Sequence, residues 1–344
     1  MKAVVKTKRG DGNIELWDVD DPKPGPDQVV IEVVATGICG SDIHIYHDDI
    51  NITLKPPVVI GHEFSGVVAE VGGNVKGIRP GDRVVSETTA SHCGKCIYCQ
   101  AGELNMCLER RVMGYWANGT FAKYCMVSKE RVHVLPESVD LDSAALTEPL
   151  ACCVHGIIEL TGVSAGDTVA VVGPGAIGLL AMQVAKAEGG RTIVLGTAKD
   201  RERLAMAKKL GADFTLEVES TNSVDAIKEL TEGYGADVVL ECSGAQAGAA
   251  MGLDLVRKKG KYTQIGLFGR PIQIDFEKVA FKEIRLTGSF SHRTISWKRS
   301  LSLMGQGKVD AKALITNEIP LSDWKKGFDM MEAKKGLKII MRPV

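Results

Sequence analysis

Residues 167–189 read DTVAVVGPGAIGLLAMQVAKAEG: an apolar strand pattern, a glycine-rich turn and an apolar helix pattern in direct succession. A GxGxxG spacing is informative when a strand precedes it and a helix follows it. The glycines allow the tight turn, the approach of backbone to a pyrophosphate and close helix–strand packing, while the helix N-terminus faces the phosphate charge. The stretch therefore predicts a dinucleotide site. The turn residues predicted to bind it are Gly173, Pro174, Gly175, Ala176, Ile177 and Gly178.

The same strand-then-helix rhythm continues to about residue 290. Six strand patterns occur at 167–173, 191–197, 213–218, 237–242, 261–266 and 284–290, and helix patterns at 176–189 and 199–211 separate the early ones. Alternation of this kind builds a parallel sheet that is covered on both faces. We therefore predict an α/β fold in which residues 153–290 form a Rossmann-type, doubly wound parallel sheet.

The residues at the end of the second strand pattern indicate whether the chain binds NAD or NADP. NAD sites usually carry an acidic residue there, whereas this chain has Gly196-Thr197, followed by Lys199 and Arg201. The missing carboxylate leaves room for a 2′-phosphate that a hydroxyl and cations can bind, so NADP is favoured and NAD stays possible. The two cations are equally typical of a solvated helix start. Leu267, after the fifth strand pattern, completes the predicted cofactor-binding set.

The first 150 residues have a different pattern, with short β-branched runs broken by Pro, Gly and Asp. These runs are KAVVK (2–6), QVVIEVVATG (28–37), EFSGVVAEVG (63–72), DRVVSETT (82–89) and AKYCMV (122–127). They predict an antiparallel, barrel-like, β-rich domain. One helix pattern and a KIIMRPV strand (338–344) follow residue 291, and we expect them to return to this domain, which then comprises residues 1–152 and 291–344.

Four cysteines, in a Cys-x2-Cys-x2-Cys-x7-Cys run, predict a metal site. Two-residue gaps let neighbouring thiolates face one ion and a longer loop returns the last ligand, as in closed structural zinc sites. An iron–sulfur cluster ranks second, because the bacterial ferredoxin run has a shorter last gap and a following Pro. Disulfides would need an oxidising compartment. The predicted structural zinc ligands are Cys93, Cys96, Cys99 and Cys107.

A second, mixed set of donors is predicted to hold a catalytic zinc. Cys39 lies in GICGSDIH, His62 and Glu63 lie in GHEFSG, and Glu148 lies in EPLACCVHG. Mixed S, N and O donors suit a catalytic zinc, which keeps one position open for water or substrate. Singly, each residue has a plainer explanation as a cap, surface or small buried residue. Their joint occurrence beside a nucleotide loop favours the metal.

Composition narrows the classes of function. The 344 residues carry a formal net charge of −1, with 44% hydrophobic and 25% charged residues, which favours neither nucleic acid nor an anionic membrane as a partner. The N-terminal stretch turns acidic before any run long enough for a signal peptide, and no stretch of about 18 apolar residues occurs. We expect a soluble, cytoplasmic protein whose nine cysteines are thiols and metal ligands.

Taken in order, the motifs GICGSDIH, GHEFSG, GDRV, the four-cysteine run, EPLACCVHG and GPGAIG resemble the zinc-containing medium-chain dehydrogenases over essentially the whole chain. The chain looks most like their polyol branch, the sorbitol and threonine dehydrogenases, because Glu148 stands where alcohol dehydrogenases have Cys. SETT (86–89), EPLACCVH and TAKDRERLAMAKKLGAD are also similar to arabitol-phosphate dehydrogenases. The resemblance implies a GroES-like catalytic domain, two zinc ions per chain and a homodimer or homotetramer.

The family resemblance also implies a reaction, hydride transfer between a secondary alcohol and NAD(P). Ser41 and His44 match the family's proton-relay positions, although a water held by Glu148 or Glu63 is a competing route. Relatives differ in whether the two glutamates bind zinc directly or through water. The expected substrate is a sorbitol-like polyol. An arabitol-phosphate-type polyol phosphate, threonine and, from another class, a non-catalytic dinucleotide-binding scaffold remain as alternatives.

Three cations after the last Rossmann strand bear on the phosphate alternative. His292, Arg293 and Lys298 offer positive charge for a substrate phosphate, and surface charge explains Lys298 equally well.

Overall fold

The computed structural model describes residues 1–49 and 52–343, which form two compact units. Unit 1 contains Met1–Glu148, His292–Gly305 and Ala311–Val344; unit 2 contains Pro149–Ser291 and Gln306–Asp310. The chain therefore leaves unit 1 after Glu148 and returns to it at His292. The last residue of the predicted KIIMRPV strand, Val344, lies outside the described residues.

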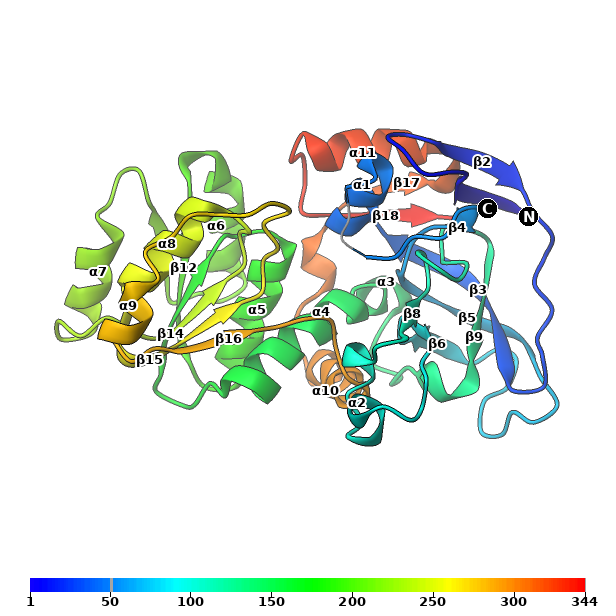
Figure 1. Ribbon diagram of the computed structural model, residues 1–344, viewed down its shortest axis with the longest axis horizontal. Helices are drawn as coiled ribbons and strands as arrows, with labels where there is room; N and C mark the ends of the chain where they lie inside the picture. The colour runs from blue at the N-terminus through cyan, green and yellow to red at the C-terminus, as the bar shows by residue number, and fades with distance from the viewer. Residues whose placement is uncertain (50–51, 344) are drawn as a thin grey trace. The chain divides into compact units, whose positions relative to one another are not determined.

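Unit 2 is built on a six-stranded parallel sheet with the order β13-β12-β11-β14-β15-β16. Figure 1 labels β12, β14, β15 and β16 among these strands. All five pairs of neighbouring strands are parallel, which confirms the predicted doubly wound sheet. Val169 to Val172 in the central strand are buried, as expected for a strand covered on both faces. The strands are β11 (Thr168–Val172), β12 (Arg191–Gly196), β13 (Phe214–Glu217), β14 (Ala236–Glu241), β15 (Val256–Gln264) and β16 (Arg285–Gly288).

The helices of unit 2 connect these strands. Because parallel connections are right-handed, α5 and α6 cover one face of the sheet, and α7 and α8 cover the other once the chain has crossed back to β14. The helices of unit 2 are α5 (Ala176–Ala187), α6 (Arg201–Lys209), α7 (Ser223–Leu230), α8 (Gln246–Leu255) and α9 (Glu277–Phe281); α4 (Thr147–Val154) leads from unit 1 into the π-helix η3 (His155–Thr161).

In the described part of the chain no helix is both long and apolar enough to span a bilayer.

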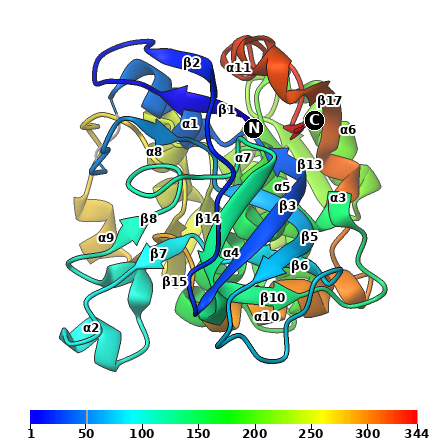
Figure 2. The same ribbon diagram turned by 90° about the vertical axis from the view of Figure 1, so that its right-hand side faces the viewer.

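Unit 1 is β-rich and mainly antiparallel, as predicted. A seven-stranded sheet has the order β10-β6-β5-β3-β18-β17, in which β18 is Lys338–Arg342 and β17 is Ile315–Pro320, with β9 also paired to β3. A smaller sheet has the order β2-β1-β4. Figure 2 shows β3, β5 and β6 side by side. The strands are β1 (Lys2–Lys6), β2 (Ile14–Asp18), β3 (Gln28–Gly37), β4 (Val58–Val59), β5 (Glu63–Val71), β6 (Arg83–Ser86), β7 (Thr89–Ser91), β8 (Arg111–Val112), β9 (Tyr124–Ser128) and β10 (Val132–Val134).

The segment after residue 291 holds more structure than the sequence predicted. It forms two helices, α10 (Thr294–Gly305) and α11 (Trp324–Glu332), and two strands, β17 (Ile315–Pro320) and β18 (Lys338–Arg342), where one helix and one strand were expected. Strand β18 pairs with β3 and so joins the sheet of unit 1. In α11, Gly327 allows close packing, since a Cβ there would lie 2.5 Å from Ile38 Cδ1. The remaining helices of unit 1 are α1 (Gly40–His47), α2 (Ile97–Gln100) and α3 (Leu141–Ala144).

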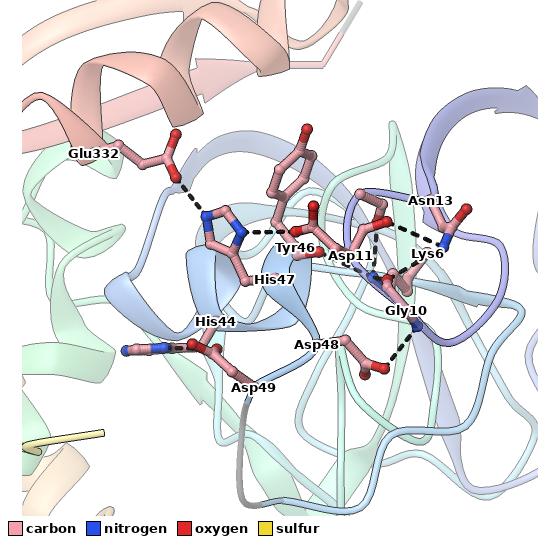
Figure 3. A network of polar contacts seen from close by, with 11 residues as sticks. Lys6, Gly10, Asp11, Asn13, His44, Tyr46, His47, Asp48, Asp49 and Glu332 are labelled. Carbon is pink, nitrogen blue, oxygen red and sulfur yellow. Dashed lines mark hydrogen bonds and ion pairs between the residues drawn. The ribbon is translucent and has the colours of Figure 1, made fainter. Parts of the chain in front are cut away.

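A buried lysine ties β1 to α1. The side chain of Lys6 is fully buried, and its ammonium group donates to the carbonyl oxygens of Gly10 (2.6 Å), Gly12 (2.7 Å) and Tyr46 (3.2 Å) (Figure 3). Burial lowers the pKa of Lys6, although the charge of Asp48 opposes this. The ammonium group thus joins three carbonyl groups of two segments, although Gly10 O also accepts from Asn13 Nδ2 and Tyr46 O also accepts from the N–H of Gly12. This contact fixes the end of the helix that carries part of the candidate site.

We predict that Lys6→Met lowers the free energy of unfolding by roughly 1–3 kcal/mol, because it removes the hydrogen bonds that the buried ammonium group donates to the carbonyl oxygens of Gly10, Gly12 and Tyr46. Chemical denaturation measures the effect, and Lys8→Met, which changes an exposed lysine of the same segment, serves as the matched control. Equal stability of the two variants would contradict this role of Lys6.

Candidate functional site

The candidate catalytic centre begins at the N-terminus of α1. Cys39 is the N-cap residue of this helix, and its backbone N–H donates to Oδ2 of Asp42 at 2.8 Å, with Asp42 in the third helical position. A helix N-terminus stabilises negative charge, so the position suits a thiolate. Asp42 is completely buried, and burial raises the pKa of its carboxyl to about 6, although the charge of His62 opposes this.

His62 and Glu63 come from the start of β5. Both side chains are buried, and the structure brings one ligand atom from each to within 4.8 Å of one another and of the Cys39 sulfur. Glu63 Oε1 is buried without a hydrogen-bond partner among the described residues. An unpaired carboxylate oxygen beside a thiol and an imidazole is the donor set that zinc accepts, so these residues fit the metal.

The electrostatics of this centre favour a cation. Burial lowers the pKa of His62, but the carboxylate of Asp42 and the thiol of Cys39 outweigh burial and raise it to about 10. The imidazole Nδ1 lies 3.6 Å from Asp42 Oδ1. A pKa raised so far reports a strongly negative potential at the ring, and a divalent cation is stabilised by the same potential.

Glu63 is held from the other end of the chain. Its Oε2 forms an ion pair with the ammonium group of Lys338 in β18, and the same ammonium group donates to the carbonyl oxygen of Ile38 at 3.2 Å. Burial alone would lower the pKa of Lys338, but the negative charges of Glu63 and Cys39 raise it. Lysine therefore occupies one oxygen of Glu63 and leaves the other for a ligand.

Glu148 lies near this centre but is not one of the three donors within 4.8 Å of one another. Its Oε1 lies 3.5 Å from Nε2 of His292. Burial raises the pKa of Glu148, but the hydrogen bond from His292 and the charge of His62 outweigh burial and bring the pKa to about 2. Glu148 is thus an ionised carboxylate that acts on His62 through its charge.

The two predicted relay residues lie on α1. Ser41 Oγ is 3.5 Å from His62 Nε2, which brings the hydroxyl to the edge of the donor cluster. His44 lies one turn further along, where its side chain is 44% exposed and its Nδ1 is 2.9 Å from Asp49 Oδ1 (Figure 3). Tyr115, which is buried, packs its ring 5.5 Å from that of His62, and burial raises its pKa well above the usual value. A hydroxyl next to the cluster and an imidazole open to solvent fit the two ends of a proton path.

The four cysteines of the 93–107 loop converge on one point. All four sulfurs lie within 4.8 Å of one another, with Cys93 Sγ 3.6 Å from Cys107 Sγ and 3.9 Å from Cys99 Sγ. These separations are too long for disulfides. They match a tetrahedron around zinc, whose edge is about 3.8 Å for Zn–S bonds of about 2.3 Å. Backbone N–H groups, that of Cys99 first, lower the pKa of Cys96 to about 6, which favours the thiolate that binds metal.

The glycine-rich turn has the geometry that close phosphate approach requires. Gly173 adopts a φ of +99°, and a Cβ on Gly178 would lie 1.9 Å from the carbonyl oxygen of Gly173, so no larger residue fits at position 178. Gly175 is the N-cap of α5 and faces open space, whereas the neighbouring Pro174 is buried. Ala176 and Ile177 begin the helix, so its free N–H groups are exposed to a bound anion.

The structure around the end of β12 explains why Gly196 stands where NAD sites usually carry an acidic residue. A Cβ on Gly196 would lie 2.9 Å from Pro174 Cγ, which leaves no space for an acidic side chain. Thr197 donates its hydroxyl to Asp200 at 2.7 Å, and Arg201 makes two hydrogen bonds to Glu217, of 2.9 and 3.3 Å. Any phosphate that uses Arg201 must therefore compete with Glu217. Lys199 and Leu267 are exposed.

The sequence analysis did not identify three residues that contact the candidate metal donors: Asp42, Lys338 and Tyr115. Asp42 could have been found from the sequence, since an acidic residue at the third helical position after Cys39 is typical of a capped helix start. Lys338 and Tyr115 could not, because their contacts with the donors join segments far apart in the chain. His292 was considered as a substrate cation, whereas in the structure it is buried and contacts Glu148.

Comparison with known proteins gives consistent matches along the whole chain. Residues 25–137 match the model of the alcohol dehydrogenase GroES-like domain, and residues 176–306 match that of the zinc-binding dehydrogenases. The chain is 47% identical to a sorbitol dehydrogenase of Halalkalibacterium halodurans over 100% of both chains. It is 39% identical to a D-arabitol-phosphate dehydrogenase of Enterococcus avium over 99% of this chain and 97% of the relative.

A solved structure is similar over nearly the same length. The crystal structure of a zinc-binding dehydrogenase from Sinorhizobium meliloti, bound to NADP, superposes with a TM-score of 0.91 at 33% identity and covers 99% of each chain.

The candidate relay helix ends in a histidine that joins three segments. His47 Nδ1 lies 2.7 Å from Asp11 Oδ1, and Nε2 lies 2.5 Å from Glu332 Oε1 in α11 (Figure 3). These two carboxylates, Glu332 first, raise the pKa of His47. Both contacts require protons on the ring nitrogens, and only the imidazolium has both.

We predict a pH-dependent difference in stability between the native protein and His47→Gln. Because the folded-state pKa of His47 is raised, its contribution is fully present below the unfolded pKa of about 6.5 and is lost as the pH rises through the folded value. Partial exposure limits the contribution to roughly 0.2–1 kcal/mol per pair. Thermal unfolding between pH 5 and 9 measures it, and a difference that grows with pH would contradict the prediction.

Proposed function

The chain is a zinc-dependent oxidoreductase of the medium-chain dehydrogenase family, in its polyol branch, and from this premise we propose that it transfers hydride between a secondary alcohol of a sorbitol-like sugar alcohol and NAD(P). One observation carries the proposal: the cluster of Cys39, His62 and Glu63, next to the Ser41 hydroxyl, in a chain 47% identical over its full length to a sorbitol dehydrogenase.

We propose that each chain holds two zinc ions. Cys39, His62 and Glu63 would hold the catalytic ion, with Glu148 as a further donor either directly or through water, and the four-cysteine loop would hold the structural ion. When bound, zinc supplies Lewis-acid polarisation of the alcohol oxygen and the nicotinamide accepts hydride. The protein residues position these groups and move the proton.

The proton of the alcohol would leave by way of α1. Ser41 Oγ is placed to accept it at the edge of the donor cluster, and His44, with Asp49 on its Nδ1, is placed to release it to solvent. A water held by Glu63 or Glu148 is the competing route. The buried ion pairs of the donors keep their side chains fixed during this transfer, because breaking a buried pair is strongly unfavourable.

For the cofactor we propose NADP as the favoured dinucleotide, with NAD accepted as well. Gly196 leaves no space for the carboxylate that binds an NAD ribose, which supports this choice, and a relative of known structure was solved with NADP. The hydroxyl of Thr197 and the cations Lys199 and Arg201 are available for a 2′-phosphate, although Glu217 competes for Arg201.

We further propose that the enzyme works in the cytoplasm as a homodimer or homotetramer. All nine cysteines are free of disulfides, as is usual for proteins of a reducing compartment, which supports the location. Strand β16 is one of the two edges of the parallel sheet in unit 2, and its Leu286 is exposed, which supports association through apolar surface.

We predict about two zinc ions per purified chain, measured by elemental analysis. Cys39→Ser should lose the catalytic ion and lower kcat/KM by about 10³-fold or more, because Lewis-acid stabilisation is worth several kcal/mol. Cys96→Ser should lose the other ion. Cys125→Ala is the matched control, since Cys125 is a buried cysteine of the same unit outside both clusters. Full activity after complete removal of zinc would overturn the proposal.

We predict that a free polyol gives the highest kcat/KM in a panel of sorbitol, xylitol, arabitol, threonine and polyol phosphates, each tested with NAD and NADP. A phosphorylated polyol preferred by orders of magnitude would assign the enzyme to the arabitol-phosphate type instead, and threonine preference to the threonine 3-dehydrogenases. If no member of the panel turned over in the zinc-loaded protein, the non-catalytic scaffold would become the better description.

A further inference from the structure

Glu241, the last residue of β14, is a completely buried carboxylate in unit 2. Its Oε1 accepts from the backbone N–H of Ser243 at 2.9 Å and from the hydroxyl of the same serine. Its Oε2 accepts from the N–H of Gly244 at 3.1 Å and from Nε2 of Gln264, in β15, at 2.6 Å. A buried carboxylate is strongly unfavourable without such donors, and these come from the loop after β14 and from the end of the neighbouring strand.

The amide of Gln264 is held in one orientation. Its Nε2 donates to the carbonyl oxygen of Gly266 at 2.7 Å as well as to Glu241, and the hydroxyl of Tyr262 donates to its Oε1 at 3.0 Å. Both acceptors face the nitrogen, so the amide cannot turn over without losing them. The backbone carbonyl of Glu241 also accepts from the N–H groups of Ile265 and Gly266, each at 2.9 Å. One residue therefore joins the loop after β14 to the loop after β15.

The two loops touch each other and the glycine-rich turn. Gly244 adopts a φ of +60°, and a Cβ there would lie 2.4 Å from the carbonyl oxygen of Leu267. A Cβ on Gly173 would lie 2.8 Å from the Cα of Ser243. The backbones of the three segments are thus packed with no space for a side chain between them, and a shift of the loop after β14 moves the surface beside the turn.

The strand order places these loops at one half of a bound dinucleotide. In the order β13-β12-β11-β14-β15-β16 the chain reverses its direction of winding between β11 and β14, and dinucleotides bind across such a point, outside the carboxyl ends of the strands. The turn after β11 receives the pyrophosphate and the end of β12 the adenosine ribose. The ends of β14 and β15 therefore remain for the nicotinamide half. The exposed Leu267, which the sequence predicted to bind the cofactor, belongs to this half.

We infer that Glu241 is a positioning residue whose carboxylate holds the loops after β14 and β15 in the conformation that binds the nicotinamide half of NAD(P). The inference rests on the proposed function for the dinucleotide alone, and on neither the zinc ions nor the substrate. Because Glu241 is buried, it acts through the backbone and side chains that donate to it. A loop that adopts its binding conformation about a tenth of the time binds its ligand about tenfold more weakly.

The central variant is Glu241→Gln, which keeps the size of the side chain. Donors face both oxygens of Glu241, so the amide nitrogen of a glutamine meets N–H groups whichever way it turns. The matched control is Asp237→Asn in the same strand. Asp237 also joins two neighbouring strands, since it accepts from the N–H of Thr168 at 2.8 Å and from Nε of Arg257 at 2.6 Å, but it lies near the opposite end of β14 from the glycine-rich turn.

The first experiment measures amide hydrogen exchange in the cofactor-free protein. We expect the N–H groups of Ser243 and Gly244 to be protected in the native protein and to exchange about tenfold faster or more in Glu241→Gln, because the carboxylate that accepts from them is lost. Exchange in β11 and β12 should be unchanged. Equal exchange of this loop in the two proteins would overturn the role of Glu241.

The second experiment separates the two halves of the cofactor by calorimetric titration with NADH, NADPH and ADP, which carries the adenosine and pyrophosphate groups alone. We expect Glu241→Gln to raise the Kd of both dinucleotides about tenfold while the Kd of ADP changes by less than about twofold. Asp237→Asn should leave all three unchanged. Equal weakening of dinucleotides and ADP, or of neither, would contradict the inference, because a general loss of structure in unit 2 affects the adenosine half as well.

Gln264→Met provides a second variant. It removes the amide that links β15 to Glu241, so it should weaken both dinucleotides and leave ADP binding unchanged. If Glu241→Gln does not fold, the titrations of Gln264→Met decide. A native protein that binds none of the three nucleotides would reject the dinucleotide site and the inference together. Dinucleotide binding without polyol turnover would reject the proposed substrate and leave Glu241 its role.

Discussion

The cost of burying charge governs how the candidate centre of unit 1 is built. An isolated buried charge is strongly unfavourable, so each ionisable side chain among the candidate metal donors needs a partner in the metal-free protein. His62 faces Asp42, and Glu63 pairs with Lys338. Glu148 faces His292. The partners come from α1, β18 and the segment before α10, so the last 53 residues of the chain are needed to hold donors from its first 150.

This requirement explains why the chain returns to unit 1 after the parallel sheet. Strand β18 extends the sheet beside β3 and delivers Lys338 to Glu63. The segment that begins at His292 delivers an imidazole to Glu148 and a tryptophan to the imidazole. Both contacts are buried, and each is a polar pair that an apolar substitute would leave half satisfied. The C-terminal segment is thus part of the centre as well as part of the core.

The two metal-donor clusters differ in how they form. The four cysteines lie within 15 residues, and short turns with backbone N–H···S contacts bring their sulfurs together. The mixed cluster draws on the start of α1 and the start of β5, which lie together only because β3 and β5 pair. A compact loop can assemble its own site, while the mixed cluster depends on the whole sheet.

Prediction from the sequence succeeded where the signal is local. Strands β1 and β3 have the predicted bounds. Four of the six strands of the parallel sheet lie within the predicted patterns, whereas β14 starts one residue earlier at Ala236 and β15 starts five residues earlier at Val256. The short strands β2, β4, β8 and β10 were missed, as were β17 and one of the two helices after residue 291. They have weak patterns because pairing and packing, rather than a periodic run of their own, determine them.

The sequence by itself determined the fold class, the glycine-rich turn and the residue types of the two candidate sets of metal donors, because each depends on short motifs with fixed spacing. Only the tertiary structure decided which partner lies beside each candidate donor: Lys338 beside Glu63, Asp42 beside His62 and His292 beside Glu148. Those pairings join residues up to 275 positions apart, and no local pattern encodes them, since the shared burial of the two side chains is what pairs them.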